Sequence, residues 1–198
     1  MNFNVILFHD FETLDVFGPV EIIGKLEQDM KIAFYSLHGG IIQNHDNVRV
    51  ETLPVADMDE TGILFIPGGA GIVNELQNQE LIQWVRKLSQ QAVFVLTVCT
   101  GSALLAKTGL LKNKYATSNK RLFDWVAGQD NEVQWMREAR WIRDGKFYTS
   151  SGVSAGMDMT LGFVNDIIGT ETAEQIAVRI EYSWNRDNEY RDPGSQEG

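Results

Sequence analysis

The stretch LTVCTGSALLAKTGLL, residues 96–111, places the single cysteine of the chain, Cys99, between an apolar run and a segment with the pattern of a helix. Upstream, the run AVFVLTV at 92–98 has the composition of a buried strand. A strand, Cys-Thr-Gly and then a helix is the order found in a nucleophile elbow, which lifts a side chain above the sheet. Because free cysteine is also among the residue types most often buried, a small buried hydrophobe at the end of a strand is the alternative for Cys99.

Other segments show that this strand belongs to a longer alternation of predicted strands and helices. Apolar runs that are nearly continuous rather than alternating, as in strands covered on both faces, occur at 4–8, 31–37, 62–69 and 92–98. Helical periodicity follows at 78–91, with Asn78 as the expected N-cap, and at 155–169. The segment 139–150 indicates two strands about Asp144-Gly145. Strands that alternate with helices predict an α/β fold with a mostly parallel sheet between two helical layers.

Length and composition limit the classes of protein to consider. With 198 residues, 43% of them hydrophobic, we expect one domain over 1–185 and a polar C-terminal tail over 186–198. The net charge of −10 is unfavourable for nucleic acid and for anionic membranes. The N-terminal apolar run is too short to span a membrane and lacks the features of a secretory signal, so a cytoplasmic location is expected. One cysteine and three scattered histidines suggest neither a disulfide nor a metal site.

Three predicted strands end in segments that can supply chemistry. These segments contain Asp15 after the first strand, Gly69 after the third and Cys99 after the fourth. Since sites in parallel sheets form beyond the carboxyl ends of the strands, we expect the three residues to meet at one rim. Asp15 lies between Leu14 and Val16, an unfavourable place for a charge unless it is paired or used. Its structural alternative is to cap a helix that begins around Pro19.

The chemistry expected at this rim starts from the thiol. A helix that starts near Thr100 would lower the pKa of Cys99 and favour the thiolate. The glycines of PGGAG, 67–71, allow close approach of a ligand to the backbone, although they can equally serve only to turn the chain, and their spacing is not that of a dinucleotide site. No histidine follows His45, and His9 is expected to be a hydrogen-bonded loop residue. Glu12, in a polar stretch, is expected to be solvated.

Several motifs together resemble a known family. The segments LDVFGP (14–19), PGGAG (67–71), VCTGSALLAKTGLL (98–111), RDGKFYTSSGVSAGMD (143–158) and IEY (180–182) resemble, in order and spacing, the ThiJ/PfpI branch of the glutamine-amidotransferase-like superfamily. The resemblance covers residues 3 to 183 and is closest to the isonitrile hydratase group. It implies a flavodoxin-like three-layer α/β sandwich, a homodimer, a small-molecule substrate and no metal or organic cofactor. It also favours the nucleophile interpretation of Cys99.

The resemblance also implies roles for individual residues. The catalytic set falls on Cys99, Asp15 and Thr100, and the implied reaction adds water to an isonitrile to give an N-substituted formamide. The residues expected to bind the substrate are Gly69, Ala70, Gly71, Asn119, Gly152 and Val153. In ATSNK, 116–120, Asn119 and Lys120 replace a histidine and a tryptophan that relatives commonly have.

Two alternatives to hydration remain open from the sequence. One is a protein without turnover that binds a metabolite or senses oxidants through Cys99. The other is a different activity of the same family, glyoxalase, deglycase or amidase chemistry, for which the sequence supplies no obvious base.

Overall fold

The computed structural model describes residues 1–26, 30–59 and 61–187. Within them an eight-stranded sheet has the strand order β3-β4-β2-β1-β5-β6-β10-β9. All neighbours run parallel except the two outermost pairs, β3 with β4 and β9 with β10. The strands of this sheet are β1 (Asn2–Ile6), β2 (Lys31–Ser36), β3 (Gly40–Gln43), β4 (Arg49–Pro54), β5 (Ile63–Ile66), β6 (Phe94–Val98), β9 (Trp141–Asp144) and β10 (Phe147–Ser150). A separate parallel pair joins β7 (Tyr115–Ala116) to β8 (Gln134–Trp135).

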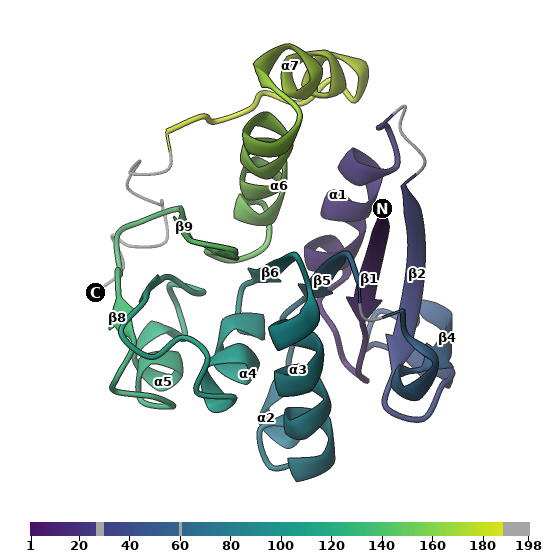
Figure 1. Ribbon diagram of the computed structural model, residues 1–198, viewed down its shortest axis with the longest axis vertical. Coiled ribbons are helices and arrows are strands. Elements are labelled where there is room, and N and C mark those ends of the chain that lie inside the picture. The colour runs from purple at the N-terminus through teal and green to yellow at the C-terminus, as the bar shows by residue number, and fades with distance from the viewer. Residues whose placement is uncertain (27–29, 60, 188–198) are drawn as a thin grey trace.

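Helices cover both faces of the sheet and so make three layers. Figure 1 shows α1, α6 and α7 on one side of the strands and α2, α3, α4 and α5 on the other. Their bounds are α1 (Thr13–Ile23), α2 (Ile72–Glu75), α3 (Gln79–Gln91), α4 (Gly101–Lys107), α5 (Phe123–Ala127), α6 (Ala155–Ile167) and α7 (Thr170–Arg179), with a 3₁₀ turn at Val55–Asp57. In the first layer α6 packs against both α1 and α7, and in the second α4 packs against α2, α3 and α5. No helix among the described residues is both long and apolar enough to cross a membrane.

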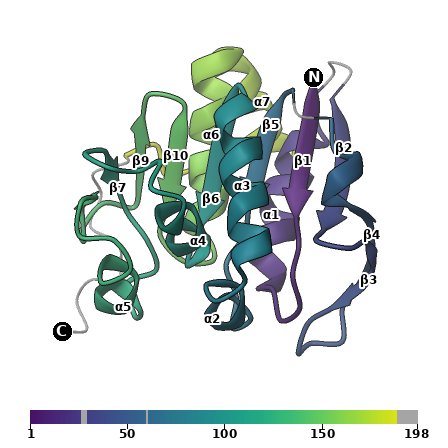
Figure 2. The same cartoon turned by 60° about the horizontal axis from the view of Figure 1, so that its bottom comes forward.

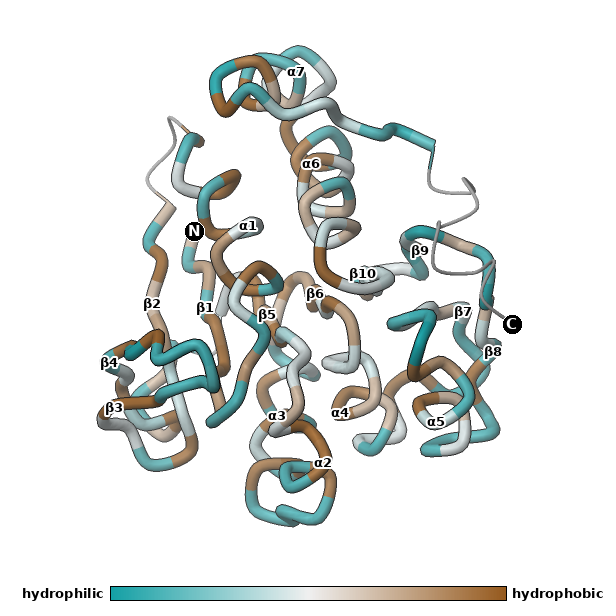
Figure 3. Tube along the Cα trace, turned by 180° about the vertical axis from the view of Figure 1, so that it is seen from behind, coloured by the Kyte–Doolittle hydropathy of each residue, from teal (hydrophilic) through white to brown (hydrophobic). Residues whose placement is uncertain are grey.

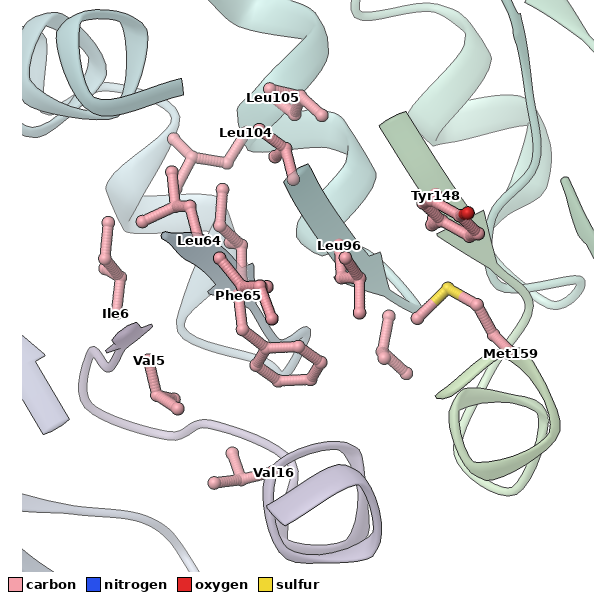
Figure 4. Packing of buried hydrophobic residues seen from close by; sticks show 14 of the residues in the cluster. Val5, Ile6, Val16, Leu64, Phe65, Leu96, Leu104, Leu105, Tyr148 and Met159 are labelled. Atoms are coloured by element: carbon pink, nitrogen blue, oxygen red, sulfur yellow. The ribbon is translucent and has the colours of Figure 1, made fainter. Parts of the chain in front are cut away.

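The hydrophobic core consists of two apolar interfaces, one on each side of the sheet. Figure 3 shows β5 and β6 mostly in the hydrophobic colour, whereas the turns at the edges are mostly hydrophilic. Neighbouring residues of a strand point to opposite faces, so Phe65 lies toward Val16 of α1 while Leu64 lies toward Leu104 of α4 (Figure 4). All four of these side chains are fully or almost fully buried. Each central strand therefore needs apolar residues at consecutive positions, which explains its continuous apolar run.

The expected fold class is confirmed, and the differences are local. Asn78 caps α3 as expected, its Oδ1 accepting a hydrogen bond from the Leu81 amide at 3.2 Å. The hairpin turn lies one residue later than predicted, at Gly145 and Lys146, because Asp144 still pairs with Phe147 in the ladder. Gly145 has a φ of 61°, the left-handed conformation that such a turn needs. Most of the expected polar tail, 188–198, lies outside the described residues.

The carboxyl ends of the central strands lie at one edge of the sheet. In Figure 2 the arrow of β1 points toward this edge, where the chain turns back into α1. The chain leaves β5 there toward α2, and it leaves β6 there toward α4. The loops that follow these three strands are therefore neighbours, and they contain the residues of the candidate site.

Candidate active site

Cys99 occupies a strained turn between β6 and α4. Its φ of 56° is in the left-handed region, which non-glycine residues rarely adopt and which costs on the order of 1–3 kcal/mol. Hydrogen bonds hold this conformation: the Cys99 amide donates to carbonyls at the end of β10, and hydroxyl groups donate to its carbonyl. The partners are the carbonyls of Ser150 and Ser151 and the hydroxyls of Ser102 and Ser118. The elbow geometry expected from the sequence is thus present, and Cys99 is also largely buried, with 6% of its surface exposed.

Asp15 lies beside this cysteine with no exposed surface. Its Oδ2 accepts a hydrogen bond from the Gly68 amide at 3.0 Å, and its Oδ1 is buried and accepts no hydrogen bond of ordinary length from the described residues. Burial raises the pKa of Asp15 from 3.8 to about 7, and the nearby charge of Glu12 adds to the rise. Contacts with the amides of Gly68 and Val153 and with the Cys99 thiol act in the opposite direction. Asp15 is therefore a carboxyl group that can gain or lose a proton near neutral pH.

The structure excludes the capping alternative for Asp15. Helix α1 begins at Thr13 rather than near Pro19, so Asp15 lies inside its first turn and Glu12 is the N-cap residue. Pro19 is accommodated within the helix. No sequence signal marked this start, because the N-cap residue is Glu12, which is not a favoured N-cap type and forms no side-chain cap.

The expectation of a lowered thiol pKa is wrong. Burial raises the pKa of Cys99 well above its ordinary value, and the carboxylate of Asp15 raises it further. The Thr100 amide and the Asn119 side chain oppose this rise by hydrogen bonding to the sulfur, but they do not overcome it. Helix α4, which was expected to favour the thiolate, has only seven residues. Cys99 therefore rests as a neutral thiol next to a potential base.

Thr100 joins the elbow to the loop after β5. Its Oγ1 accepts a hydrogen bond from the Gly69 amide at 3.2 Å, and the residue is almost fully buried. The loop must pass very close to the elbow: a Cβ on Gly68 would lie 2.7 Å from the Thr100 nitrogen and 2.8 Å from the Cys99 Cβ. Close contact between the two backbones therefore requires glycine at position 68. From the sequence alone, the role of the PGGAG glycines was undecided between close approach of a ligand and turning of the chain.

Asn119 and Lys120, the two departures from the relatives' motif, have different roles. The Asn119 Nδ2 donates a hydrogen bond to the Cys99 Sγ at 3.1 Å, while its Oδ1 accepts one from the Leu122 amide at 3.1 Å. The Lys120 Nζ instead donates to the Thr117 hydroxyl and the Ala139 carbonyl, and Lys120 is buried. Asn119 is therefore part of the site, and Lys120 holds the segment that carries it.

A cavity of about 410 Å³ opens onto Cys99. Of the residues expected to contact a substrate, Gly69, Ala70, Asn119 and Val153 line it together with Cys99 and Thr100. Gly152 is not in its wall, although a Cβ there would come 3.8 Å from the Cys99 Sγ. Gly71 is not part of the wall either, because its backbone packs against the carbonyl of His9 at the start of α2.

The cavity is also lined by Glu12, Arg121 and Leu122, which were not expected there from the sequence. Glu12 was expected to be solvated, yet it is half buried and reaches the wall with Arg121 and Leu122. The sequence contained a hint for Arg121 and Leu122, because they directly follow the ATSNK segment, 116–120, which contains the expected substrate-binding residue Asn119. His9 is a loop residue as expected, with its Nδ1 3.2 Å from the Gln43 carbonyl oxygen.

Neither a histidine nor a metal-binding cluster accompanies the thiol in the part of the chain that the structure describes. The residues that line the cavity there include no histidine. Groups of three or more His, Cys, Asp or Glu side chains that could hold a metal ion are also not found among those residues. The chemistry open to this site is proton transfer between the Cys99 thiol and the Asp15 carboxyl, together with nucleophilic attack by sulfur.

A left-handed cysteine elbow at the carboxyl edge of a parallel sheet, paired with a buried carboxyl group, defines a class of α/β proteins with a nucleophile-elbow site. The chain belongs to the DJ-1/PfpI family, whose model matches residues 2–166. This finding confirms the resemblance to ThiJ/PfpI proteins.

The relatives of this chain have names of different kinds, an enzyme in one case and a transcriptional regulator in another. The chain is 25% identical to an isonitrile hydratase from Pseudomonas putida over 181 residues, 90% of this chain and 77% of that protein. It is 32% identical to the HTH-type transcriptional regulator CdhR from Pseudomonas aeruginosa over 80% of this chain, which spans only 47% of the regulator. A crystal structure of a ThiJ/PfpI family protein from Pseudomonas syringae matches with a TM-score of 0.84 at 26% identity, covering 93% of this chain and 76% of that one. The family thus includes named enzymes as well as regulators.

Proposed function

We propose that the protein is an isonitrile hydratase-like enzyme that converts an isonitrile and water into an N-substituted formamide without a metal or organic cofactor. The observation that carries this proposal is the juxtaposition of two buried groups at the carboxyl edge of the sheet, the Cys99 thiol on its left-handed elbow and the Asp15 carboxyl, whose pKa burial raises to about 7. Similarity to an isonitrile hydratase over most of both chains supports the same reaction.

The terminal carbon of an isonitrile suits such a pair because it accepts both a nucleophile and a proton. In the first step Asp15, as the carboxylate, takes the proton of the Cys99 thiol while the sulfur forms a bond to this carbon. Asp15 then gives the same proton to the carbon. The product is a thioimidate, R–N=CH–S–Cys99, and the carboxylate is restored. No charge leaves the cavity, which is favourable where burial disfavours ions.

Hydrolysis of the thioimidate can use the same carboxyl group. Asp15 takes a proton from water as its oxygen adds to the carbon, and passes that proton to the nitrogen. The C–S bond then breaks, the sulfur recovers a proton from the new hydroxyl group through Asp15, and R–NH–CHO is released. Asn119 donates a hydrogen bond to the sulfur and thereby stabilises its negative charge as the bond forms and breaks. Thr100, bound to the Gly69 amide, fixes the wall beside the reacting carbon.

The alternatives fit this geometry less well. Oxidant sensing uses an accessible thiolate, whereas burial and the Asp15 carboxylate keep the Cys99 thiol protonated. The resemblance implies that other branches of the family have a histidine directly after the cysteine. This chain has Thr100 at that position. Deglycase or glyoxalase chemistry would have to use Asp15 as its base.

The test is formamide production from a simple alkyl isonitrile, followed by NMR of the formyl proton. Wild-type protein is expected to turn over, and Cys99→Ala is expected to be inactive while keeping the same far-UV circular dichroism. Peroxide treatment with intact mass spectrometry serves as the second arm. Ready oxidation of Cys99 with no formamide from wild type would overturn the proposal in favour of sensing.

A further inference from the structure

Charged side chains stand in the wall of the cavity that opens onto Cys99. Arg121 and Glu12 both line it, together with the apolar side chains of Leu122 and Val153. Hydration of a small neutral isonitrile requires neither charge. The volume of about 410 Å³ is within the range of pockets that hold ligands much larger than the isonitrile group itself. The wall therefore has room and charge for a substituent on the substrate.

Arg121 is exposed, and its guanidinium has no partner in the described part of the chain. Three arginines that follow it differ in this respect. Arg137 pairs with Asp124, Arg140 pairs with Asp158, and Arg143 pairs with Asp166. Arg121 is the arginine among the described residues that line the cavity, so its guanidinium is available there for a ligand.

The backbone that carries Arg121 is tied to the reacting sulfur. Asn119 bonds to the Cys99 Sγ through its Nδ2 and to the Leu122 amide through its Oδ1. Lys120 is held by hydrogen bonds from its Nζ to the Thr117 hydroxyl and the Ala139 carbonyl. Arg121 lies between these anchored positions, so its Cα is fixed relative to the sulfur while its side chain is free to reach into the cavity.

We propose that Arg121 is a specificity-determining residue that binds a carboxylate on the substrate, so that the preferred substrate is an isonitrile with a carboxylate on its substituent. This inference rests on the proposed function for the identity of the reacting group. A planar guanidinium matches a carboxylate with two parallel hydrogen bonds. Such a contact is needed here for a second reason: the chain has a net charge of −10, and Glu12 and Asp15 both repel an anion that enters the cavity.

The first experiment does not depend on isonitrile turnover. Cys99 is the only cysteine, so intact mass spectrometry measures its alkylation directly. Iodoacetate and iodoacetamide have nearly the same size and differ in charge, and the ratio of their rates reports attraction of an anion to the sulfur. We expect Arg121→Gln to lower this ratio about tenfold. Arg86→Gln, a matched loss of charge on the exposed face of α3, is expected to leave it unchanged.

The second experiment measures substrate preference. A short isocyano-carboxylate and its methyl ester are compared as substrates, and Arg121→Gln is expected to raise KM about tenfold for the carboxylate and to leave that for the ester unchanged. Equal alkylation ratios in Arg121→Gln and Arg86→Gln would overturn the anion site. If wild type turns over neither isonitrile, the proposed function and the substrate class both fail, while the alkylation ratio still decides whether Arg121 binds anions next to Cys99.

Discussion

Replacement of Asp15 by asparagine is expected to stabilise the folded protein at pH 8, although the same change should remove most of the activity. The carboxyl group is fully buried, and one of its oxygens accepts no hydrogen bond of ordinary length from the described residues. Its pKa rises from 3.8 to about 7 on folding, so keeping it ionised in the folded state costs about 4 kcal/mol. Asparagine carries no charge and keeps an oxygen for the Gly68 amide. Its new N–H donors cost about 1–3 kcal/mol if unpaired, which leaves a net gain of about 2 kcal/mol.

The sign of the pH dependence follows from proton binding. Between about pH 4 and pH 7 the folded protein keeps the Asp15 proton and the unfolded chain releases it, so this group lowers the free energy of unfolding as pH rises. The ionisation cost that Asp15→Asn removes is therefore absent near pH 4 and complete by pH 8, so the variant should be about 1–3 kcal/mol less stable than wild type near pH 4 and more stable at pH 8. Other titrating groups are the same in both proteins, and the difference between them isolates Asp15.

Urea denaturation at pH 4.5, 6 and 8 measures these differences. Asp10→Asn is the matched control, because Asp10 is exposed and already has a left-handed φ of 58° that asparagine tolerates. This control is expected to change the free energy of unfolding by less than about 0.5 kcal/mol at every pH. An Asp15→Asn protein that is less stable than wild type at pH 8, or equally stabilised at all three values, would refute the reasoning.

Two further changes test the strain and the hydrogen bond at the site. Val153 is a β-branched residue with a φ of 48°, so Val153→Gly is expected to raise the free energy of unfolding by about 1 kcal/mol. The control Val73→Gly in α2 should lower it by a similar amount. Destabilisation by both changes would contradict the strain assigned to Val153. Asn119→Ala removes the donor to the Cys99 sulfur and is expected to slow alkylation by iodoacetamide about three- to tenfold, with Asn119→Asp slower still because it adds a negative charge. Unchanged rates in both variants would exclude Asn119 from thiol activation.

The central part of the fold was predictable because its signals are local and strong. The strands at 31–36, 63–66 and 94–98 are short apolar runs, and α3 has both an apolar stripe and an N-cap at Asn78. The outer strands β3 and β4 lacked such a signal. Their exposed positions carry polar and apolar residues alike, Ile41 and Leu53 among them, so no clear alternation marks them as strands. Short edge elements depend on the sheet they join more than on their own sequence.

The site was predictable in its residues but not in its electrostatics. Asp15, Gly69 and Cys99 meet at the rim, as topology requires for residues that follow neighbouring parallel strands. The thiol pKa was assigned the wrong direction because a sequence shows where a helix starts but not how deeply the sulfur is buried. For the same reason Arg121 was not recognised, since whether a surface arginine is paired depends on its neighbours in space.

The pH profile of formamide production tests most directly the claim that Asp15 is the base for the Cys99 thiol. The carboxylate is the active form, so kcat/KM of wild type for an alkyl isonitrile is expected to rise with pH through an apparent pKa near 7 and then reach a plateau. Asp15→Asn is expected to lose at least about a hundredfold in kcat/KM and to lose this rise as well. A wild-type profile that is flat between pH 5 and pH 9, or an Asp15→Asn protein with wild-type rates, would contradict the account.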